Sequence, residues 1–194
     1  MYYVCMRVFF IASRQGRPYF DYYYQQILNF LDREGYENIN KEYLQKNKKT
    51  IEEELKKLGK KGYSARLNLL VEKIHNADIC IFECSFQSLS VGYLIEKALE
   101  LDKPVVGLCL VDHIPDFLVG LENEKFQLVE YDKDNLSDLL KASILKAIFL
   151  TDKRFNFFIS SNMLAYLNKV SKKLSITKST FIRNLIEEYK KNNP

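Results

Sequence analysis

The chain has 194 residues, of which 47% are hydrophobic and 28% charged, the ordinary composition of a globular protein. No apolar run approaches the roughly 20 residues that a membrane-spanning helix needs, so the composition favours a cytoplasmic protein without a membrane segment. The net charge of +4 is uneven, because residues 151–194 carry nine Lys/Arg against three Asp/Glu. A near-neutral body with a basic tail indicates two modules, of which the tail faces a polyanion.

The first 75 residues contain a predicted strand followed by helical segments. Residues 3–12 are rich in β-forming residues and end at the polar loop "SRQGRP". A helix is predicted over about 20–33, with Gly35 as its stop. Residues 41–62 are highly charged, so an exposed helix or a mobile insertion is expected there, and helical spacing returns over 67–74.

Three further apolar runs are predicted strands. The runs "ICIFEC" (79–84) and "VVGLCL" (105–110) are nearly continuous, as in parallel strands that are covered on both faces. A helix over 91–101 is predicted between them, and a strand over 126–131 and a helix over 135–150 follow. This alternation predicts an α/β domain with a doubly wound (Rossmann-like, flavodoxin-like) parallel sheet over residues 1–150.

The four cysteines and two histidines form no metal-binding or redox pattern. Cys80 and Cys84 are four residues apart on a predicted strand, which is neither a CxxC pair nor the spacing of zinc ligands. All four cysteines are expected to be buried, reduced thiols of a cytosolic protein. The histidines are expected to be solvated. We therefore expect no metal ion and no other cofactor.

Two loops follow predicted strands at the edge of the sheet where ligands bind in this architecture. One is "SRQGRP", and the other is "SFQSLSVG" after the strand "ICIFEC". The second loop opens a helix, whose free backbone N–H groups and dipole favour an anion. Its serines, Ser85, Ser88 and Ser90, could bind a phosphate or a ribose, or they could simply cap the helix.

The segment "NADICIFECSFQSLSVGYLIEKALELDKPVVGL", together with the N-terminal "VFFIASRQG", resembles the nucleoside 2-deoxyribosyltransferase superfamily. That superfamily includes the 2'-deoxynucleoside 5'-monophosphate N-glycosidases. The resemblance covers most of the first 150 residues and implies a nucleotide pocket at the two loops. The ligand-binding residues expected from the loops and from this resemblance are Ser13, Ser85, Ser88, Ser90, Gly92 and Tyr93.

The same resemblance implies that catalysis is weakened or lost. The nucleophilic Glu that follows Gly-Tyr in that superfamily is Leu94 here, and a second carboxylate falls on Leu70. Glycosyl transfer depends on such carboxylates. Glu83, which matches the Glu that closes the strand, is the remaining catalytic candidate. Three possibilities stay open for this domain: retained catalysis, nucleotide binding without chemistry, and a structural or dimerising scaffold.

The tail follows a different pattern. Residues 154–159 alternate as in a strand, and two amphipathic helices are predicted after them. The first helix is expected to be capped within residues 160–162 and the second by Thr177. Because so short a segment cannot bury its apolar residues alone, two copies are expected to pair. The tail resembles the ribbon-helix-helix DNA-binding fold of the CopG, Arc and MetJ type, with Ser175 in place of the usual Gly.

In that fold a two-stranded ribbon enters the major groove of DNA, and alternate side chains reach the base edges. The resemblance implies that the ribbon residues facing the bases are Arg154, Asn156 and Phe158. It also implies a phosphate-binding start of the second helix, made by Thr177, Lys178 and Ser179. The alternative is a dimerisation module with a basic face.

Together these interpretations predict a homodimeric or higher oligomeric transcriptional regulator. It would bind double-stranded DNA through residues 151–194 and carry a non-catalytic domain, over residues 1–150, for a nucleotide or nucleoside ligand. One alternative is a working deoxyribosyltransferase or deoxynucleoside monophosphate N-glycosidase with an assembly tail. Another is a non-catalytic oligomeric scaffold.

Overall fold

The computed structural model describes residues 6–45, 48–150, 158–174 and 176–193. The chain divides into two compact units, Met1–Asp152 and Lys153–Pro194, and each is described by itself. None of the described helices combines the length and the apolar character needed to cross a bilayer.

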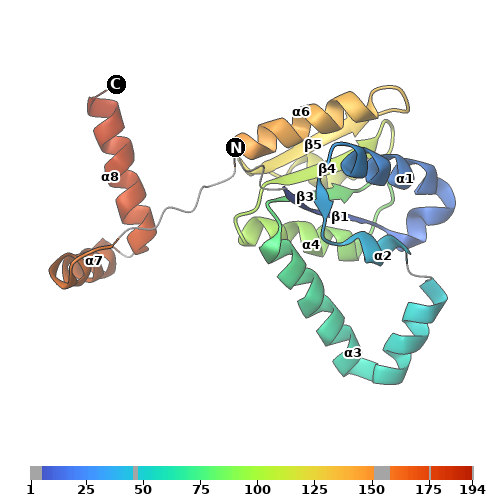
Figure 1. Cartoon of the computed structure of the whole chain (residues 1–194), viewed down its shortest axis with the longest axis horizontal. Coiled ribbons are helices and arrows are strands. Elements are labelled where there is room, and N and C mark those ends of the chain that lie inside the picture. Colours follow the sequence, from blue (N-terminus) through green and yellow to red (C-terminus); the bar gives the residue numbers. More distant parts are fainter. Residues whose placement is uncertain (1–5, 46–47, 151–157, 175, 194) are drawn as a thin grey trace. The chain divides into compact units, whose positions relative to one another are not determined.

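The first unit is built on a sheet of five parallel strands in the order β2-β1-β3-β4-β5 (Figure 1). The strands are β1 (Arg7–Ala12), β2 (Glu37–Asn38), β3 (Ile79–Glu83), β4 (Val105–Leu110) and β5 (Phe126–Tyr131). The predicted α/β class with a parallel sheet is confirmed, and the order is that of a flavodoxin-like, doubly wound sheet. β2 was not predicted, because a two-residue edge strand leaves no periodic signal.

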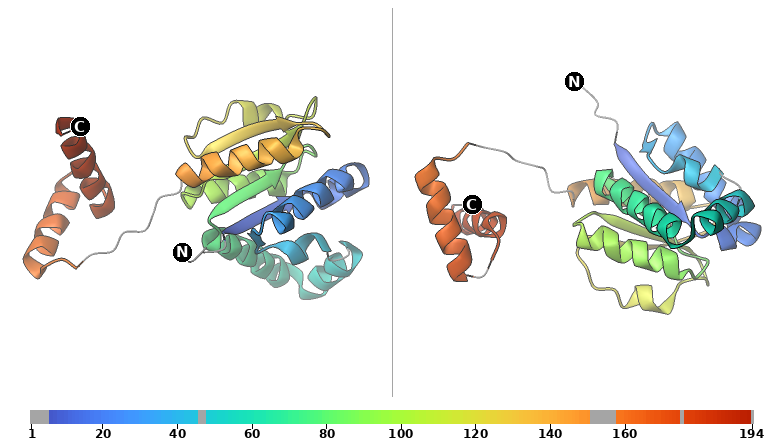
Figure 2. Two further views of the ribbon diagram at one scale, coloured as in Figure 1. Left: turned by 45° about the horizontal axis from the view of Figure 1, so that its top comes forward. Right: turned by 90° about the horizontal axis from the view of Figure 1, so that it is seen from below.

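Helices cover both faces of this sheet (Figure 2). One face packs against α1 (Arg17–Arg33) and α6 (Leu136–Phe149), and the other against α3 (Lys48–Asn76) and α4 (Leu89–Glu100). All five residues of β3 are buried, with Ile79 and Ile81 on the α1–α6 side and Cys80 and Phe82 on the α3–α4 side. This double coverage explains why β3 and β4 are continuous apolar runs in the sequence.

The described residues of the highly charged region 41–62 are helical. This region contains α2 (Lys41–Gln45) and the first part of α3. Helix α3 as a whole projects from the domain as two arms (Figure 1). The arms meet at Gly59, whose φ of 57° and ψ of −149° interrupt the helix. Because a side chain is strongly disfavoured in this conformation, glycine permits the bend. The short elements η1 (Arg14–Gly16) and α5 (Asp116–Val119) were not predicted.

The second unit contains the two predicted helices, α7 (Ser161–Leu174) and α8 (Lys178–Asn192). Ser160 Oγ accepts a hydrogen bond from the Met163 backbone N–H at 3.4 Å, which caps α7. Thr177 Oγ1 accepts from the Thr180 N–H at 3.1 Å, which confirms the predicted cap of α8. The predicted strand falls largely on residues 154–157, outside the described residues, and Phe158 and Ile159 belong to no strand. The ribbon-helix-helix arrangement therefore stays a prediction.

Substitution of Thr177 by Ala should weaken the start of α8. The variant loses the side-chain acceptor for the Thr180 N–H, and such a loss typically costs about 1 kcal/mol. Faster amide hydrogen exchange in the first turn of α8 is the expected result. The matched control is Ser179→Ala, because that exposed side chain lies inside the helix. Equal exchange in the Thr177 variant and in the unmodified chain would contradict the cap.

Candidate functional site

The candidate site lies at the carboxyl ends of β1 and β3. The chain leaves β1 toward α1 on one face of the sheet, and it leaves β3 toward α4 on the other. In doubly wound folds ligands bind at such a switch point, between the two connecting loops. The loops are residues 13–16 and 84–88, the two loops that the sequence singles out.

Glu83, the last residue of β3, is a carboxyl group with 0% exposure. Its Oε1 accepts hydrogen bonds from the Ser85 hydroxyl, from the Ser85 N–H at 3.2 Å and from the Tyr131 hydroxyl at 3.0 Å. The Ser85 oxygen also accepts from the Leu110 N–H at 2.8 Å. One buried side chain therefore links the ends of β3, β4 and β5.

The second carboxyl oxygen of Glu83, Oε2, does not accept the hydrogen bonds that Oε1 accepts. Glu83 Oε2 and the Tyr24 hydroxyl are both buried, and neither makes a hydrogen bond of good geometry to a described residue. The Tyr24 hydroxyl nevertheless lies close enough to the Glu83 carboxyl to interact with it, and this interaction contributes to the raised pKa of Tyr24. A Cβ atom on Gly16 would overlap with the Tyr24 hydroxyl and with the Cβ of Phe86. Gly16 therefore lies between the buried polar group and the Phe86 side chain, where only glycine fits.

Burial sets the protonation of this group. Removal from water raises the pKa of Glu83 above its ordinary value, and the hydrogen bonds from Ser85 and Tyr131 offset part of that rise. Burial, with the negative charge of Glu83 as a further cause, also raises the pKa values of Tyr24 and Tyr131. Burial thus shifts the Glu83 carboxyl toward its protonated form and the two tyrosines toward their neutral form.

The residues predicted to bind a ligand lie in different environments. Ser13 and Ser85 are buried, with 5% and 6% exposure, and Ser85 is engaged with Glu83. Ser88 is the N-cap of α4 but its side chain makes no capping hydrogen bond, so the interpretation of this serine as a simple cap gains no support. The remaining three lie in the first turns of α4, namely the exposed Ser90, the half-buried Gly92 and the exposed Tyr93.

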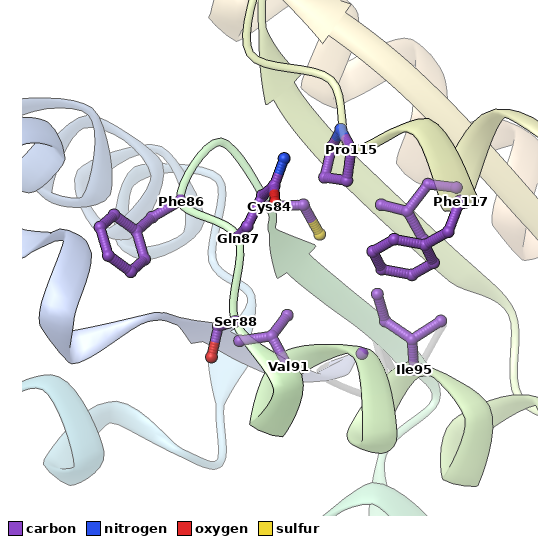
Figure 3. Close-up of a pocket in the computed structure, with 10 residues that line it drawn as sticks. Cys84, Phe86, Gln87, Ser88, Val91, Ile95, Pro115 and Phe117 are labelled. Carbon is purple, nitrogen blue, oxygen red and sulfur yellow. The ribbon is translucent and has the colours of Figure 1, made fainter.

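A small pocket lies on the α4–α5 side of the loop after β3. Figure 3 shows side chains from α4, α5 and the loop around it, including Cys84, Val91, Ile95, Pro115 and Phe117. Its cavity volume is about 10 Å³, enough for about one water molecule and far too small for a nucleotide. The free thiol of Cys84 is buried, as are those of Cys80 and Cys109, which confirms the prediction for these three. Cys5 lies outside the described residues.

Leu94 and Glu83 are separated by the sheet. Leu94 has 3% exposure and packs in the core on the α3–α4 side, together with Leu70. Glu83 meets Tyr24 and Tyr131, whose side chains belong to the core on the α1–α6 side. Glu83 therefore cannot take over the role of a carboxylate at position 94 without a rearrangement of the fold.

Two aromatic contacts form the rim of the candidate site. The rings of Tyr19 in α1 and Phe86 in the loop after β3 are nearly parallel, with an interplanar angle of 10° and centroids 6.4 Å apart. Phe20 meets the exposed His113 edge-on at 5.3 Å. Sequence reasoning missed these residues and both buried tyrosines. Tyr24 did carry a signal, because it lies on the same helix face as Ile27, Leu28 and Leu31 and so needed a buried position for its hydroxyl.

Four of the six predicted DNA-contacting residues lie in the described part of the chain, and two lie outside it. Thr177, Lys178 and Ser179 are exposed and consecutive at the start of α8. Phe158 is also exposed. Arg154 and Asn156 lie outside the described residues. Within the described ranges, no group of three or more His, Cys, Asp or Glu side chains could hold a metal ion.

Replacement of Glu83 by Gln should remove a pH dependence of stability. Folding raises the pKa of Glu83 above its ordinary value of 4.5. The contribution of this carboxyl to the stability of the fold is therefore most favourable below pH 4.5, and it is lost as the pH rises through the pKa of the folded state. We expect the unfolding free energy of the unmodified chain, relative to Glu83→Gln, to fall as the pH rises above 4.5. The fall should be about 1.4 kcal/mol for each unit by which the pKa is raised.

The measurement is urea unfolding at several pH values. Glu72→Gln serves as the control, because that carboxyl is exposed on α3 and the variant should follow the unmodified chain. A stability difference between Glu83→Gln and the unmodified chain that does not change with pH would contradict a buried carboxyl of raised pKa.

Introducing a carboxylate at position 94 should destabilise the protein. Leu94→Glu would place a charge in the apolar core on the α3–α4 side, and an uncompensated buried charge typically costs about 3–5 kcal/mol. The neighbouring Tyr93→Glu is the matched control, because Tyr93 is 43% exposed. Thermal unfolding should show a large drop only for the Leu94 variant. Equal melting temperatures for the two variants would contradict the burial of Leu94.

No protein-family model matches the chain, and a search of curated proteins likewise finds no match. The site is therefore characterised by its own geometry. It combines a buried carboxyl that accepts hydrogen bonds from hydroxyl groups, a stacked pair of aromatic rings from α1 and the loop after β3, and an apolar core around Leu94. The Glu83 carboxyl has no exposed surface in this structure.

Proposed function

We propose that the chain is a dimeric DNA-binding regulator whose α/β unit binds a nucleotide or nucleoside without chemistry. The observation that carries the proposal is the unpaired apolar surface of the basic second unit. Two helices form its described part, and large apolar side chains on both are exposed, namely Met163, Leu164, Tyr166, Leu174, Leu185, Ile186 and Tyr189.

A unit of this size cannot bury enough apolar surface by itself to be stable. Pairing with a second copy would cover the same residues on both chains, since a two-fold interface is self-complementary. The spacing of these residues supports such pairing, because Leu185, Ile186 and Tyr189 recur at one, three and four residues along α8. A dimer is therefore the simplest arrangement that shields the two helices from water.

The charge of the second unit favours DNA as its partner. Nine Lys/Arg against three Asp/Glu lie in residues 151–194. The start of α8 offers free backbone N–H groups next to Lys178, with the Thr177 side chain already fixed as the cap. Backbone N–H groups at a helix start, beside a lysine, bind phosphate well.

The α/β unit supports the non-catalytic part of the proposal. The position expected for a nucleophile is the buried Leu94, and Glu83 lies on the opposite face of the sheet. The site retains polar groups and aromatic rings at the switch point, which are the parts that bind rather than react. No specific observation favours glycosyl transfer over binding.

DNA binding is testable with the full chain and labelled genomic fragments in a fluorescence anisotropy titration. We expect binding at low salt that weakens steeply as salt is added, because phosphate contacts release counterions. Lys178→Ala should reduce the slope of log affinity against log salt by about 1 if it removes one phosphate contact. Lys146→Ala, an exposed lysine on α6, is the matched control and should leave the slope unchanged. Absence of binding to every fragment at low salt would overturn the DNA-binding proposal.

A further inference from the structure

The bend of α3 carries a cluster of lysines. The two arms of this helix meet at Gly59, and residues 56–61 around it read "KKLGKK", with four lysines and no acidic residue. We call this segment, residues 56–61, the elbow. The side chains of Lys57, Lys60 and Lys61 are exposed. Figure 1 shows that the elbow is the part of α3 farthest from the sheet, so these charges project from the α/β unit.

Two glycines shape the elbow. Gly59 has a φ of 57° and a ψ of −149°, a conformation in which a side chain is strongly disfavoured. Gly62, in the second arm, is buried, and a Cβ atom on it would overlap with the Leu58 side chain at the end of the first arm. The two arms are therefore in close contact at the bend. This contact fixes the bend and, with it, the positions of the lysine backbones on its two sides.

The exposed lysines of the elbow have no acidic partner in the described part of the chain. The ion pairs found there use other cations, and none of them includes Lys57, Lys60 or Lys61. Like charges this close along a helix repel one another, which destabilises the segment. A polyanion bound at the elbow would turn this repulsion into attraction.

We propose that the elbow binds the phosphate backbone of double-stranded DNA, so that the α/β unit makes phosphate contacts of its own. The inference rests on the DNA-binding role proposed for the second unit. Charge complementarity carries it, because the DNA duplex has one negative charge per about 1.7 Å of its axis. Lysines bind phosphates as point charges, and a projecting group of them therefore needs no fitted pocket. Such contacts position a protein on DNA without reading its sequence.

An anionic membrane surface fits the elbow less well. Helices that lie on a bilayer present a broad apolar face beside their lysines. Among the side chains of residues 57–63, only Leu58 and Tyr63 are large, apolar and exposed, and Leu58 lies against Gly62. The elbow thus offers a bilayer mainly charge, which is what DNA binding requires.

The test is a fluorescence anisotropy titration of the full chain with labelled double-stranded DNA at several salt concentrations. Each lost phosphate contact lowers the slope of log affinity against log salt by about 0.9. Replacement of Lys57, Lys60 and Lys61 together by Ala should therefore lower the slope by about 2–3. Replacement of the same three residues by Arg keeps the charge and should keep the slope.

A second triple variant separates local contacts from net charge. It replaces by Ala three exposed lysines on α6 or in the loop before it, namely Lys133, Lys141 and Lys146. This control loses the same charge and should leave the slope unchanged. A slope that falls equally in both triple alanine variants would overturn the elbow contact, because net charge alone would then account for the fall.

The remaining outcomes distinguish the elbow from the second unit. An unchanged slope in the elbow alanine variant, with a lower slope for Lys178→Ala, would overturn the elbow contact and leave the proposed function standing. The reverse result would support the elbow and overturn the phosphate contact proposed for α8. Absence of DNA binding by the unmodified chain would overturn both.

Vesicles of phosphatidylserine and phosphatidylcholine in equal parts provide the membrane comparison. We expect the elbow alanine variant and the unmodified chain to bind them equally in a sedimentation assay. Vesicle binding that only the elbow variant loses, together with an unchanged DNA slope, would assign the elbow to a membrane surface and overturn the proposal. Circular dichroism checks that each variant is folded, as expected for the replacement of exposed side chains.

Discussion

The hydrogen bonds around Glu83 hold together the edge of the sheet on which the candidate site depends. Tyr131 at the end of β5 and Ser85 after β3 donate to one carboxyl oxygen, and Ser85 accepts from the backbone of Leu110 at the end of β4. These contacts join three strands where the sheet would otherwise fray. They also place a carboxyl of raised pKa directly below the loops that define the candidate site. The same group thus stabilises the edge and sets its polarity.

The apolar and the polar features of the site lie on opposite faces of the sheet. On the α3–α4 side the core is apolar up to the start of α4, and Leu94 belongs to it. On the α1–α6 side buried hydroxyls and the carboxyl meet under an aromatic rim. The polar groups on the α1–α6 side are fully buried, and the small pocket lies on the α4 side.

Much of the fold was predictable because its strands are covered on both faces. The runs at 79–84, 105–110 and 126–131 stand out as apolar segments, and the observed strands agree with them to within one residue. β2 and α5 were missed because each is too short for a periodic pattern. The helices of the tail were predictable from their caps and apolar spacing, and Thr177 performs the expected role.

The site was less predictable because it depends on contacts between distant residues. Glu83 could be singled out from the resemblance of its strand, but its partner Tyr131 is 48 residues away and enters only through the register of β4 and β5. The direction of Leu94, into the core on the α3–α4 side, likewise follows from how α4 packs on the sheet. The pairing of Tyr19 with Phe86 requires the start of α1 to meet the loop after β3, which no local pattern encodes.

The association state of the full chain tests the central claim most directly, because the exposed apolar faces of α7 and α8 require a partner. Sedimentation equilibrium over a range of micromolar concentrations measures it without a ligand or DNA. We expect the mass of two chains, or of a multiple of two, and a shift toward one chain when the exposed Leu185 and Ile186 are both replaced by Asp. The mass of a single chain across the whole range would contradict it.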